Sequence, residues 1–199
     1  MKVIVIGASG TIGKAVANNL AARHEVIAVG SKSGDYRADI AYPAQVKALF
    51  ESVGKVDAVV VAAGTVHFGA LDTITPEQFQ IGLASKLMGQ VNVAQTALAW
   101  LNDGGSITLT SGILSEQPIR YGASASMVNL AVEGYARSAA LELPRGLRIN
   151  VVSPTILEES VDAYGPYFLG FEPAPAKRVA LAYSRSVDGA QTGQIYRVW

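Results

Sequence analysis

Three glycines near the beginning of the chain have the spacing of a phosphate-binding turn. Gly7, Gly10 and Gly13 follow the apolar run 3–6, which predicts a strand buried on both faces, and a helical pattern begins at about residue 11. Backbone N–H groups and the positive end of the helix dipole converge at such a junction and favour a pyrophosphate. We expect Gly7 to allow the tight turn, Gly10 to let a phosphate approach the backbone, and Gly13 to let the helix pack on the strand.

Other side chains at the same turn extend this interpretation. Ser9 and Thr11 add hydroxyl donors, and Ile12 opens the buried face of the helix expected over 12–22. The alternative is a tight turn without a ligand, because a glycine triplet alone is weak evidence. The position of the triplet after the N-terminal strand of an alternating β/α chain favours nucleotide binding.

The segment after the second predicted strand, 25–29, indicates which nucleotide is bound. In a dinucleotide-binding fold this segment contacts the adenosine ribose, and an NAD-selective site carries Asp or Glu there. This chain has Gly30, Ser31, Lys32 and Ser33 instead. A hydroxyl beside an ammonium suits a 2′-phosphate, so we predict NADP(H) in preference to NAD(H). The alternative is an ordinary polar loop.

Predicted strands and helices alternate along the chain, which is typical of a parallel, doubly wound sheet. The strands are expected at 3–6, 25–29, 39–40, 57–61, 106–110, 146–152 and 193–199. The helices are expected at 12–22, 43–53, from about 75 into a long helix 82–101, then at 121–143 and 176–186. We therefore predict an α/β fold in which residues 1–199 form a single Rossmann-fold domain, with about seven strands, helices on both faces and a short substrate cap at 155–175.

The composition excludes several classes of function. Sixteen basic residues balance sixteen acidic ones, so nothing directs the chain toward nucleic acid or an anionic membrane. The absence of cysteine and the presence of only two histidines argue against a metal site. The apolar start is too short for a signal or transmembrane segment, and a cytoplasmic protein is the default expectation.

The balance of apolar and charged residues points to an oligomer. Half of the residues are hydrophobic and only 16% are charged, so part of the outer surface is expected to be buried between subunits. The expected helices 82–101 and 121–143 are apolar over most of their surface. We predict a homodimer or homotetramer that pairs through them.

Several short motifs, taken in their order, resemble those of the short-chain dehydrogenase/reductase family along nearly the whole chain. The motifs are the glycine turn 7–13, Asp39-Ile40, Ala62-Ala63-Gly64, Thr110-Ser111, Tyr121 followed by Gly-Ala-Ser, the segment 148–154, and Gln191 followed by Thr-Gly-Gln. Beyond the turn, Ser31 and Lys32, the cofactor-binding residues that the resemblance implies are Asp39, Ile40, Ala62, Ala63, Gly64, Pro154, Thr155 and Ile156.

The resemblance also implies a chemistry, namely hydride transfer between a nicotinamide and a carbonyl or alcohol. It assigns Ser111 to positioning the carbonyl and Tyr121 to delivering the proton. The family's lysine, which holds the nicotinamide ribose and lowers the pKa of the tyrosine, stands four residues after the tyrosine. This chain has Ala125 there, and no lysine occurs between Lys86 and Lys177.

Lys86 offers a replacement for the missing cation. It lies three residues before Gly89, where the family usually has the asparagine of a proton relay, and it is the only charge in an otherwise apolar helix. The hypothesis is that Lys86 reaches into the site from the neighbouring helix. The alternative is a lysine on a solvated helix face.

These observations together predict an NADP(H)-dependent oxidoreductase that acts on a small carbonyl or alcohol substrate. The aromatic residues Tyr164, Tyr167 and Phe168 in the cap 155–175 suit a small, partly apolar compound. Retention of Ser111 and Tyr121 favours an enzyme. The absence of the usual lysine favours the alternative of a catalytically weak NADP(H)-binding sensor, and a structural subunit of a mixed oligomer is a third possibility.

Overall fold

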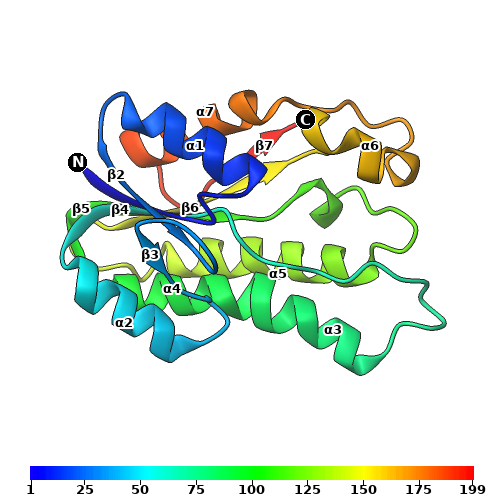
Figure 1. Cartoon of the computed structure of the whole chain (residues 1–199), viewed down its shortest axis with the longest axis horizontal. Helices are drawn as coiled ribbons and strands as arrows, with labels where there is room; N and C mark the ends of the chain where they lie inside the picture. The colour runs from blue at the N-terminus through cyan, green and yellow to red at the C-terminus, as the bar shows by residue number, and fades with distance from the viewer.

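A seven-stranded parallel sheet forms the middle layer of the molecule (Figure 1). The computed structural model describes residues 1–199. The strand order is β3-β2-β1-β4-β5-β6-β7. The strands are β1 (Lys2–Ile6), β2 (Glu25–Gly30), β3 (Tyr36–Arg37), β4 (Val56–Val61), β5 (Leu101–Thr110), β6 (Arg148–Pro154) and β7 (Ile195–Val198). The predicted doubly wound α/β fold is confirmed.

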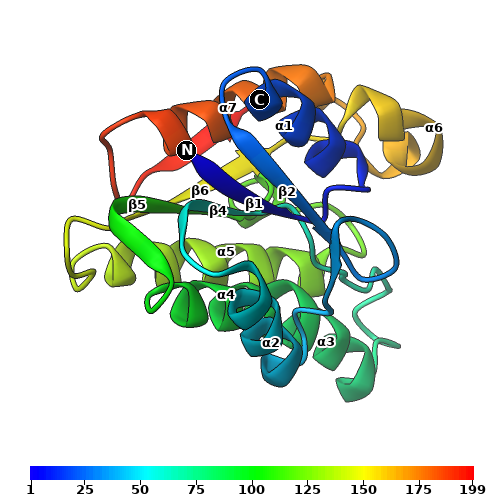
Figure 2. The same ribbon diagram turned by 60° about the vertical axis from the view of Figure 1, so that its left-hand side comes forward.

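Helices cover both faces of this sheet, as Figures 1 and 2 show from two directions. One face carries α1 (Thr11–Ala21) and α7 (Ala176–Asp188), which pack side by side. The other face carries α2 (Pro43–Val53), α4 (Gly89–Ala97) and α5 (Ala123–Ala139). The shorter helices are α3 (Pro76–Gly82), which continues into a π-helical turn at Leu83–Met88, and α6 (Val161–Tyr164). None of the helices combines the length and apolar character that crossing a membrane requires.

The apolar run of β1 fills both cores because successive side chains of a strand point to opposite faces. Ile4 and Ile6 belong to the core beneath α2, α4 and α5, whereas Val3 and Val5 belong to the core beneath α1 and α7. All four are at most 1% exposed. A strand without polar alternation is therefore the sequence signature of this central position.

The strand order reverses at β1, and this reversal opens a crevice at the carboxyl ends of the strands. β1 pairs with β2 on one side and β4 on the other, and the chain leaves β1 in the glycine turn. Helices on either side of such a switch point diverge, so ligands of doubly wound folds bind there. The residues of the candidate site lie in and beside this crevice.

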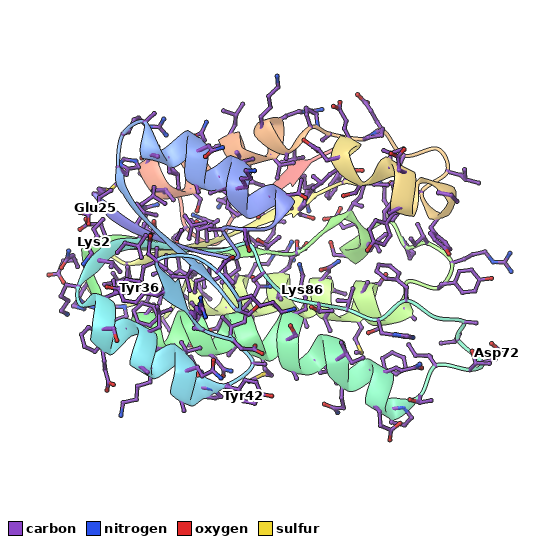
Figure 3. The ribbon with its side chains drawn as sticks, viewed as in Figure 1. Lys2, Glu25, Tyr36, Tyr42, Asp72 and Lys86 are labelled. Carbon is purple, nitrogen blue, oxygen red and sulfur yellow. The ribbon has the colours of Figure 1, made fainter.

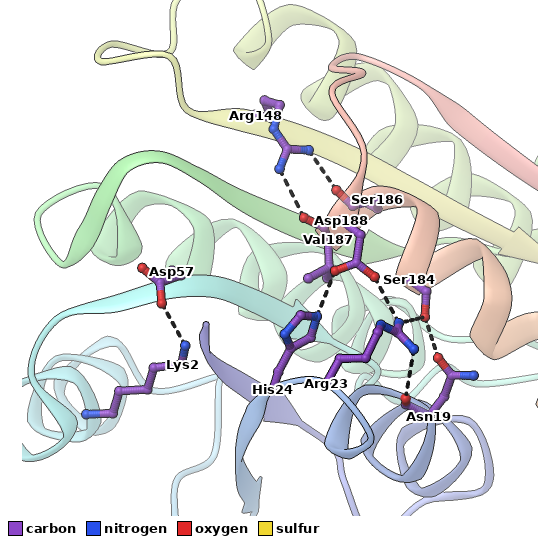
Figure 4. A network of polar contacts seen from close by, with 10 residues as sticks. All are labelled: Lys2, Asn19, Arg23, His24, Asp57, Arg148, Ser184, Ser186, Val187 and Asp188. Carbon is purple, nitrogen blue, oxygen red and sulfur yellow. Dashed lines mark hydrogen bonds and ion pairs between the residues drawn. The ribbon is translucent and has the colours of Figure 1, made fainter.

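A polar network joins α1 to α7 at the opposite end of these helices (Figure 4). The carboxylate of Asp188 accepts hydrogen bonds from Arg23 Nη2 at 2.9 Å and His24 Nε2 at 2.7 Å. Burial alone would raise the pKa of Asp188, but these two bonds hold it below its ordinary value. Ser184 adds a hydrogen bond to Asn19. The network fixes α7 against α1.

Two predicted strands are placed differently by the structure. The third strand is Tyr36–Arg37 and not 39–40, because backbone pairing with β2 ends at Arg37. The strand expected at 106–110 begins at Leu101, and the segment 102–105 lies within it as an irregularity. Val56 pairs with Leu101 whereas Ala58 pairs with Ser106, so β5 bulges between the two pairs.

Three predicted helices have clearly different limits. The helix expected at 82–101 ends at Ala97 and includes the π-helical turn, and the helix expected at 121–143 spans only Ala123–Ala139. The helix expected at 176–186 continues to Asp188.

The predicted helix start near residue 75 is confirmed by a capping box. Thr75 Oγ1 accepts from the backbone N–H of Gln78, and Gln78 Oε1 accepts from the backbone N–H of Thr75.

Candidate active site

The glycine turn has the close contacts expected from its spacing. Gly7 has a φ of +84°, and a Cβ added there would lie 2.4 Å from the carbonyl oxygen of Ala62. A Cβ at Gly13 would lie 2.0 Å from the carbonyl oxygen of Gly7, so α1 packs directly on the turn. No side chain caps the N-terminus of α1 at Gly10. The first N–H groups of α1 are therefore available to an anion.

A cleft of about 360 Å³ begins at this turn and follows the ends of β2 and β4. Of the predicted cofactor-binding residues, those that line it are Gly7, Ser9, Gly10, Ser31, Asp39, Ile40, Ala62, Ala63 and Gly64. Thr11 faces a separate polar groove beside α1, and Lys32 lies exposed in the loop after β2 without lining the cleft. The structure thus brings most of the predicted set together.

A second cavity of about 310 Å³ lies at the carboxyl ends of β5 and β6. Its wall includes Ser111, Lys86 and, from the predicted cofactor-binding set, Ile12, Pro154, Thr155 and Ile156. The cap contributes Tyr164 and Phe168. Gly64 lines both the cleft and the cavity, so the two adjoin at this residue.

Lys86 extends from the π-helical turn toward Ser111. Its Nζ donates to the backbone carbonyl oxygen of Ser111 at 3.3 Å, which leaves two of its three N–H donors without a protein partner. Figure 3 shows Lys86 in the middle of the molecule, whereas Lys2 and Asp72 lie at its periphery. Desolvation lowers the pKa of Lys86 from 10.5 to about 8. The hypothesis that this lysine reaches the site agrees with the geometry.

Two neighbours fix the backbone of Lys86. The side chain of Gln90, fully buried, donates to the carbonyl oxygens of Lys86 and Thr110 at 2.8 Å each and accepts from the N–H of Thr110. Gly64, with a φ of +131°, lies so close that an added Cβ would be 2.8 Å from both Cα and Cδ of Lys86. The π-helical turn is therefore held against β5 and the loop after β4, and such turns recur at functional sites.

The hydroxyl of Ser111 is bound by a residue that sequence reasoning missed. Ser111 Oγ donates to Glu133 Oε1 at 2.8 Å, and Ser115 Oγ donates to the same oxygen at 2.7 Å. Glu133 belongs to α5 and is only 1% exposed. The signal that could have identified it is the one that singled out Lys86, since Glu133 is the only acidic residue within α5.

Tyr121 is not brought to Ser111 by the structure. It precedes α5, has a φ of 66° and is 45% exposed. Its ring packs edge-on against Tyr167 with centroids 6.1 Å apart, in an aromatic pocket that it shares with Phe68. The α5 residues that line the cavity of Ser111 are Ala125 and Asn129.

Two polar atoms of the cavity wall have no partner in the protein. Asn129 Oδ1 and Thr155 Oγ1 are buried and make no hydrogen bond. Because an unsatisfied buried polar atom is costly, such atoms in a cavity wall indicate a bound molecule that completes their hydrogen bonds.

Comparison with known proteins identifies the family. A family model described as enoyl-(acyl carrier protein) reductase matches residues 2–182. The chain belongs to the short-chain dehydrogenase/reductase family. It is therefore similar to a large set of oxidoreductases that share the sheet topology described above and use a nicotinamide cofactor.

Individual members are similar to different extents. The crystal structure of protein lin1944 from Listeria innocua is 51% identical, covers 100% of both chains and has a TM-score of 0.99. A small-chain dehydrogenase in complex with NADPH is 26% identical, covers 100% of this chain and 96% of the other, and has a TM-score of 0.90. Tetrahydroxynaphthalene reductase PfmaG from Pestalotiopsis fici is 36% identical over 69% of this chain, which spans only 53% of that relative's length.

The residues of this member of the family fit a nicotinamide dinucleotide. The uncapped N-terminus of α1 is suited to the pyrophosphate, and the turn of Gly7 leaves the backbone accessible. The cleft and the cavity adjoin at Gly64, and Asn129 and Thr155 have unpaired polar atoms in the wall of the cavity. No group of three or more acidic or histidine side chains that could hold a metal ion is present.

Proposed function

We propose that the protein is an NADP(H)-dependent oxidoreductase that transfers hydride to or from a small carbonyl or alcohol compound. The observation that carries the proposal is that the cleft that begins at the glycine turn and the cavity that holds Ser111 and Lys86 adjoin at Gly64. A dinucleotide with its pyrophosphate at α1 would extend from the cleft toward the cavity.

The preference for NADP(H) rests on the segment after β2. Ser31 lines the cleft, Lys32 follows it in an exposed loop, and residues 30–33 include no carboxylate. A ribose 2′-phosphate beside Ser31 would therefore meet its hydroxyl, with the ammonium of Lys32 at the next position of the loop. The similar dehydrogenase that was crystallised with NADPH supports the same preference.

The chain's own residues have distinct parts in the proposed reaction. The bound nicotinamide supplies or accepts the hydride. Lys86 faces the cavity and orients the oxygen of a carbonyl substrate, Ser111 accepts from the hydroxyl of an alcohol substrate, and Asn129 and Thr155 offer unpaired polar atoms to the ligand. Phe68, Tyr164 and Phe168 form the apolar part of the wall and exclude water from the reacting carbon.

Calorimetry with NADPH and NADH, each on wild type, Ser31→Asp and Ser33→Asp, tests the cofactor preference. We expect wild type to bind NADPH more tightly than NADH. A carboxylate at position 31 should weaken NADPH binding about tenfold or more through repulsion of the 2′-phosphate. Ser33→Asp is the matched control, because Ser33 is exposed in the same loop but does not line the cleft. Equal binding of both nucleotides by wild type would refute the preference, and binding of neither would refute the function.

The sensor hypothesis is not favoured. It rests on the missing lysine, whereas the ammonium of Lys86 donates to the backbone carbonyl oxygen of Ser111 and offers another cation. The similar proteins include reductases such as PfmaG.

A further inference from the structure

We propose that Lys86 itself is the acid that gives its proton to the substrate oxygen, in place of the tyrosine that the family uses. The inference rests on the proposed function and assigns the proton step within it. It also implies that Tyr121 has no part in that step.

The two residues of α5 that line the cavity are not acids. Ala125 and Asn129 line the cavity one helical turn apart, with the same four-residue separation as the tyrosine and lysine of the family motif. They are 2% and 6% exposed, so both positions are turned inward. The side chains of Ala125 and Asn129 cannot deliver a proton at neutral pH. Tyr121 could, but it lies one turn earlier in the chain and lines the aromatic pocket outside the cavity.

The other polar groups of the cavity are unsuitable or already engaged. The single proton of the Ser111 hydroxyl is donated to Glu133, and the hydroxyl of Thr155 is too weak an acid. Glu133 accepts from two hydroxyls and does not line the cavity. Tyr164 lines it from the cap, but 48% of Tyr164 is exposed and its ring packs against Phe68.

Lys86 is the group that remains with protons to give. One of its N–H donors is used on the carbonyl oxygen of Ser111, and the other two are free. The titratable groups that line the cavity, adjoin it or bond to its wall are Tyr164 from the segment 155–175, Asp39 in the neighbouring cleft and Glu133, which binds Ser111. No carboxylate forms an ion pair with Lys86. The ammonium is thus held by a neutral acceptor, which makes release of its proton easier.

The proton step balances in both directions. When the carbonyl carbon accepts the hydride of the reduced nicotinamide, the electron pair of the C=O π bond moves to oxygen. That oxygen forms an O–H bond as one Nζ–H bond of Lys86 breaks, and the neutral amine then regains a proton from water. In the direction of alcohol oxidation, the neutral amine accepts the hydroxyl proton. The lowered pKa of about 8 suits an acid that must act near neutrality.

The test combines titration of the free protein with the kinetics of three variants, using 2,3-butanedione and phenanthrenequinone as probe carbonyls. NMR of ¹⁵N-labelled lysine side chains should show one ammonium that titrates near pH 8 and is missing in Lys86→Met. With a probe, kcat/KM of wild type should fall above the same pH. Lys86→Met and Lys86→Arg should each lose about a hundredfold or more of kcat, because Arg keeps the positive charge but cannot release a proton.

Tyr121→Phe is the matched comparison. We expect it to retain kcat within about threefold, since it keeps its ring, loses only its hydroxyl and lies outside the cavity. A comparable loss in Tyr121→Phe, or retained activity in Lys86→Arg, would overturn the assignment. So would a Lys86 that titrates at its ordinary pKa, even if no probe is turned over. Failure of wild type to bind NADPH in calorimetry would instead refute the proposed function, so the two failures are distinguishable.

Discussion

At the scale of the residue, the orientation of Ser111 depends on Glu133. A hydroxyl has one proton to donate, and that of Ser111 points to Glu133 Oε1, away from any substrate. Its lone pairs remain available as acceptors, so Ser111 can orient a substrate hydroxyl without any change in this bond. Glu133 is therefore a positioning residue that acts through Ser111 and Ser115.

Removal of the Glu133 side chain should destabilise the protein measurably. Glu133→Ala leaves two hydroxyls without their acceptor and opens a cavity beside β5, so we expect the free energy of unfolding to fall by about 2–4 kcal/mol. Ser115→Ala is the control, because it removes only one of the two bonds and should lose about 1 kcal/mol. Urea denaturation of the three proteins measures both values. An unchanged midpoint in Glu133→Ala would show that the carboxyl does not hold the two serines.

The residues of the candidate site differ in how far sequence could predict them. Gly7 and Gly13 act through local geometry, so their spacing was sufficient. Lys86 could be singled out because it is the only charge in an otherwise apolar helix, and burying a charge is costly unless the side chain has a specific role. Glu133 was missed because its partner, Ser111, lies 22 residues away in sequence. Tyr121 was assigned from a sequence motif alone. The motif does not show which face of α5 lies against the cavity, and that face carries Ala125 and Asn129.

At the scale of the element, the π-helical turn and the loop after β4 form one unit. The extra residue that a π-turn accommodates changes which side chains point to β5, and Lys86 lies within that turn. Gly64 has room for no side chain because the backbone of Lys86 passes beside it. The close approach of these two segments places the ammonium at Ser111.

Gly64→Ala should therefore displace Lys86 as well as strain the backbone. We expect a loss of about 1–3 kcal/mol of stability together with a Lys86 pKa that moves back toward 10.5, as read from the lysine titration. Gly54→Ala is the matched control: its φ of +78° imposes similar strain, but nothing lies within 4 Å of the added Cβ. Gly54→Ala should lose stability and leave the lysine titration unchanged. If the two variants titrate alike, Gly64 does not position Lys86.

Elements with a strong local pattern were predicted well, and those fixed by tertiary pairing were not. The apolar runs of β1 and β4 and the start of α3 followed from residue types alone. The extension of β5 to Leu101 depends on the pairing of Leu101 with Val56. The bulge between Leu101 and Ser106 contains Asn, Asp and Gly, which are typical of a turn and give no sign of a strand. The π-helical turn has no periodicity that distinguishes it from the α-helices around it. Its presence depends on packing against Gly64 and β5.

At the scale of the whole molecule, both helical layers expose large apolar side chains. α5 presents Met127 and Leu130 to solvent at 41% and 54% exposure, and Met88 beside it is 46% exposed. Gly134, farther along α5, has open space where a side chain would lie. On the other layer, Leu181 of α7 is also 59% exposed. The sequence predicts pairing through the layer that contains α4 and α5.

Leu130→Glu should convert the protein to single chains, because it places a charge in the predicted interface at both copies of a symmetric contact. Sedimentation velocity should give wild type a mass of two or four chains of 20.8 kDa. Leu181→Glu is the control, since it adds the same charge at a similarly exposed leucine on the opposite layer. It should leave the wild-type mass unchanged. Dissociation by Leu181→Glu alone would assign the contact to the α1–α7 layer, and a wild type that sediments as one chain would remove the oligomer altogether.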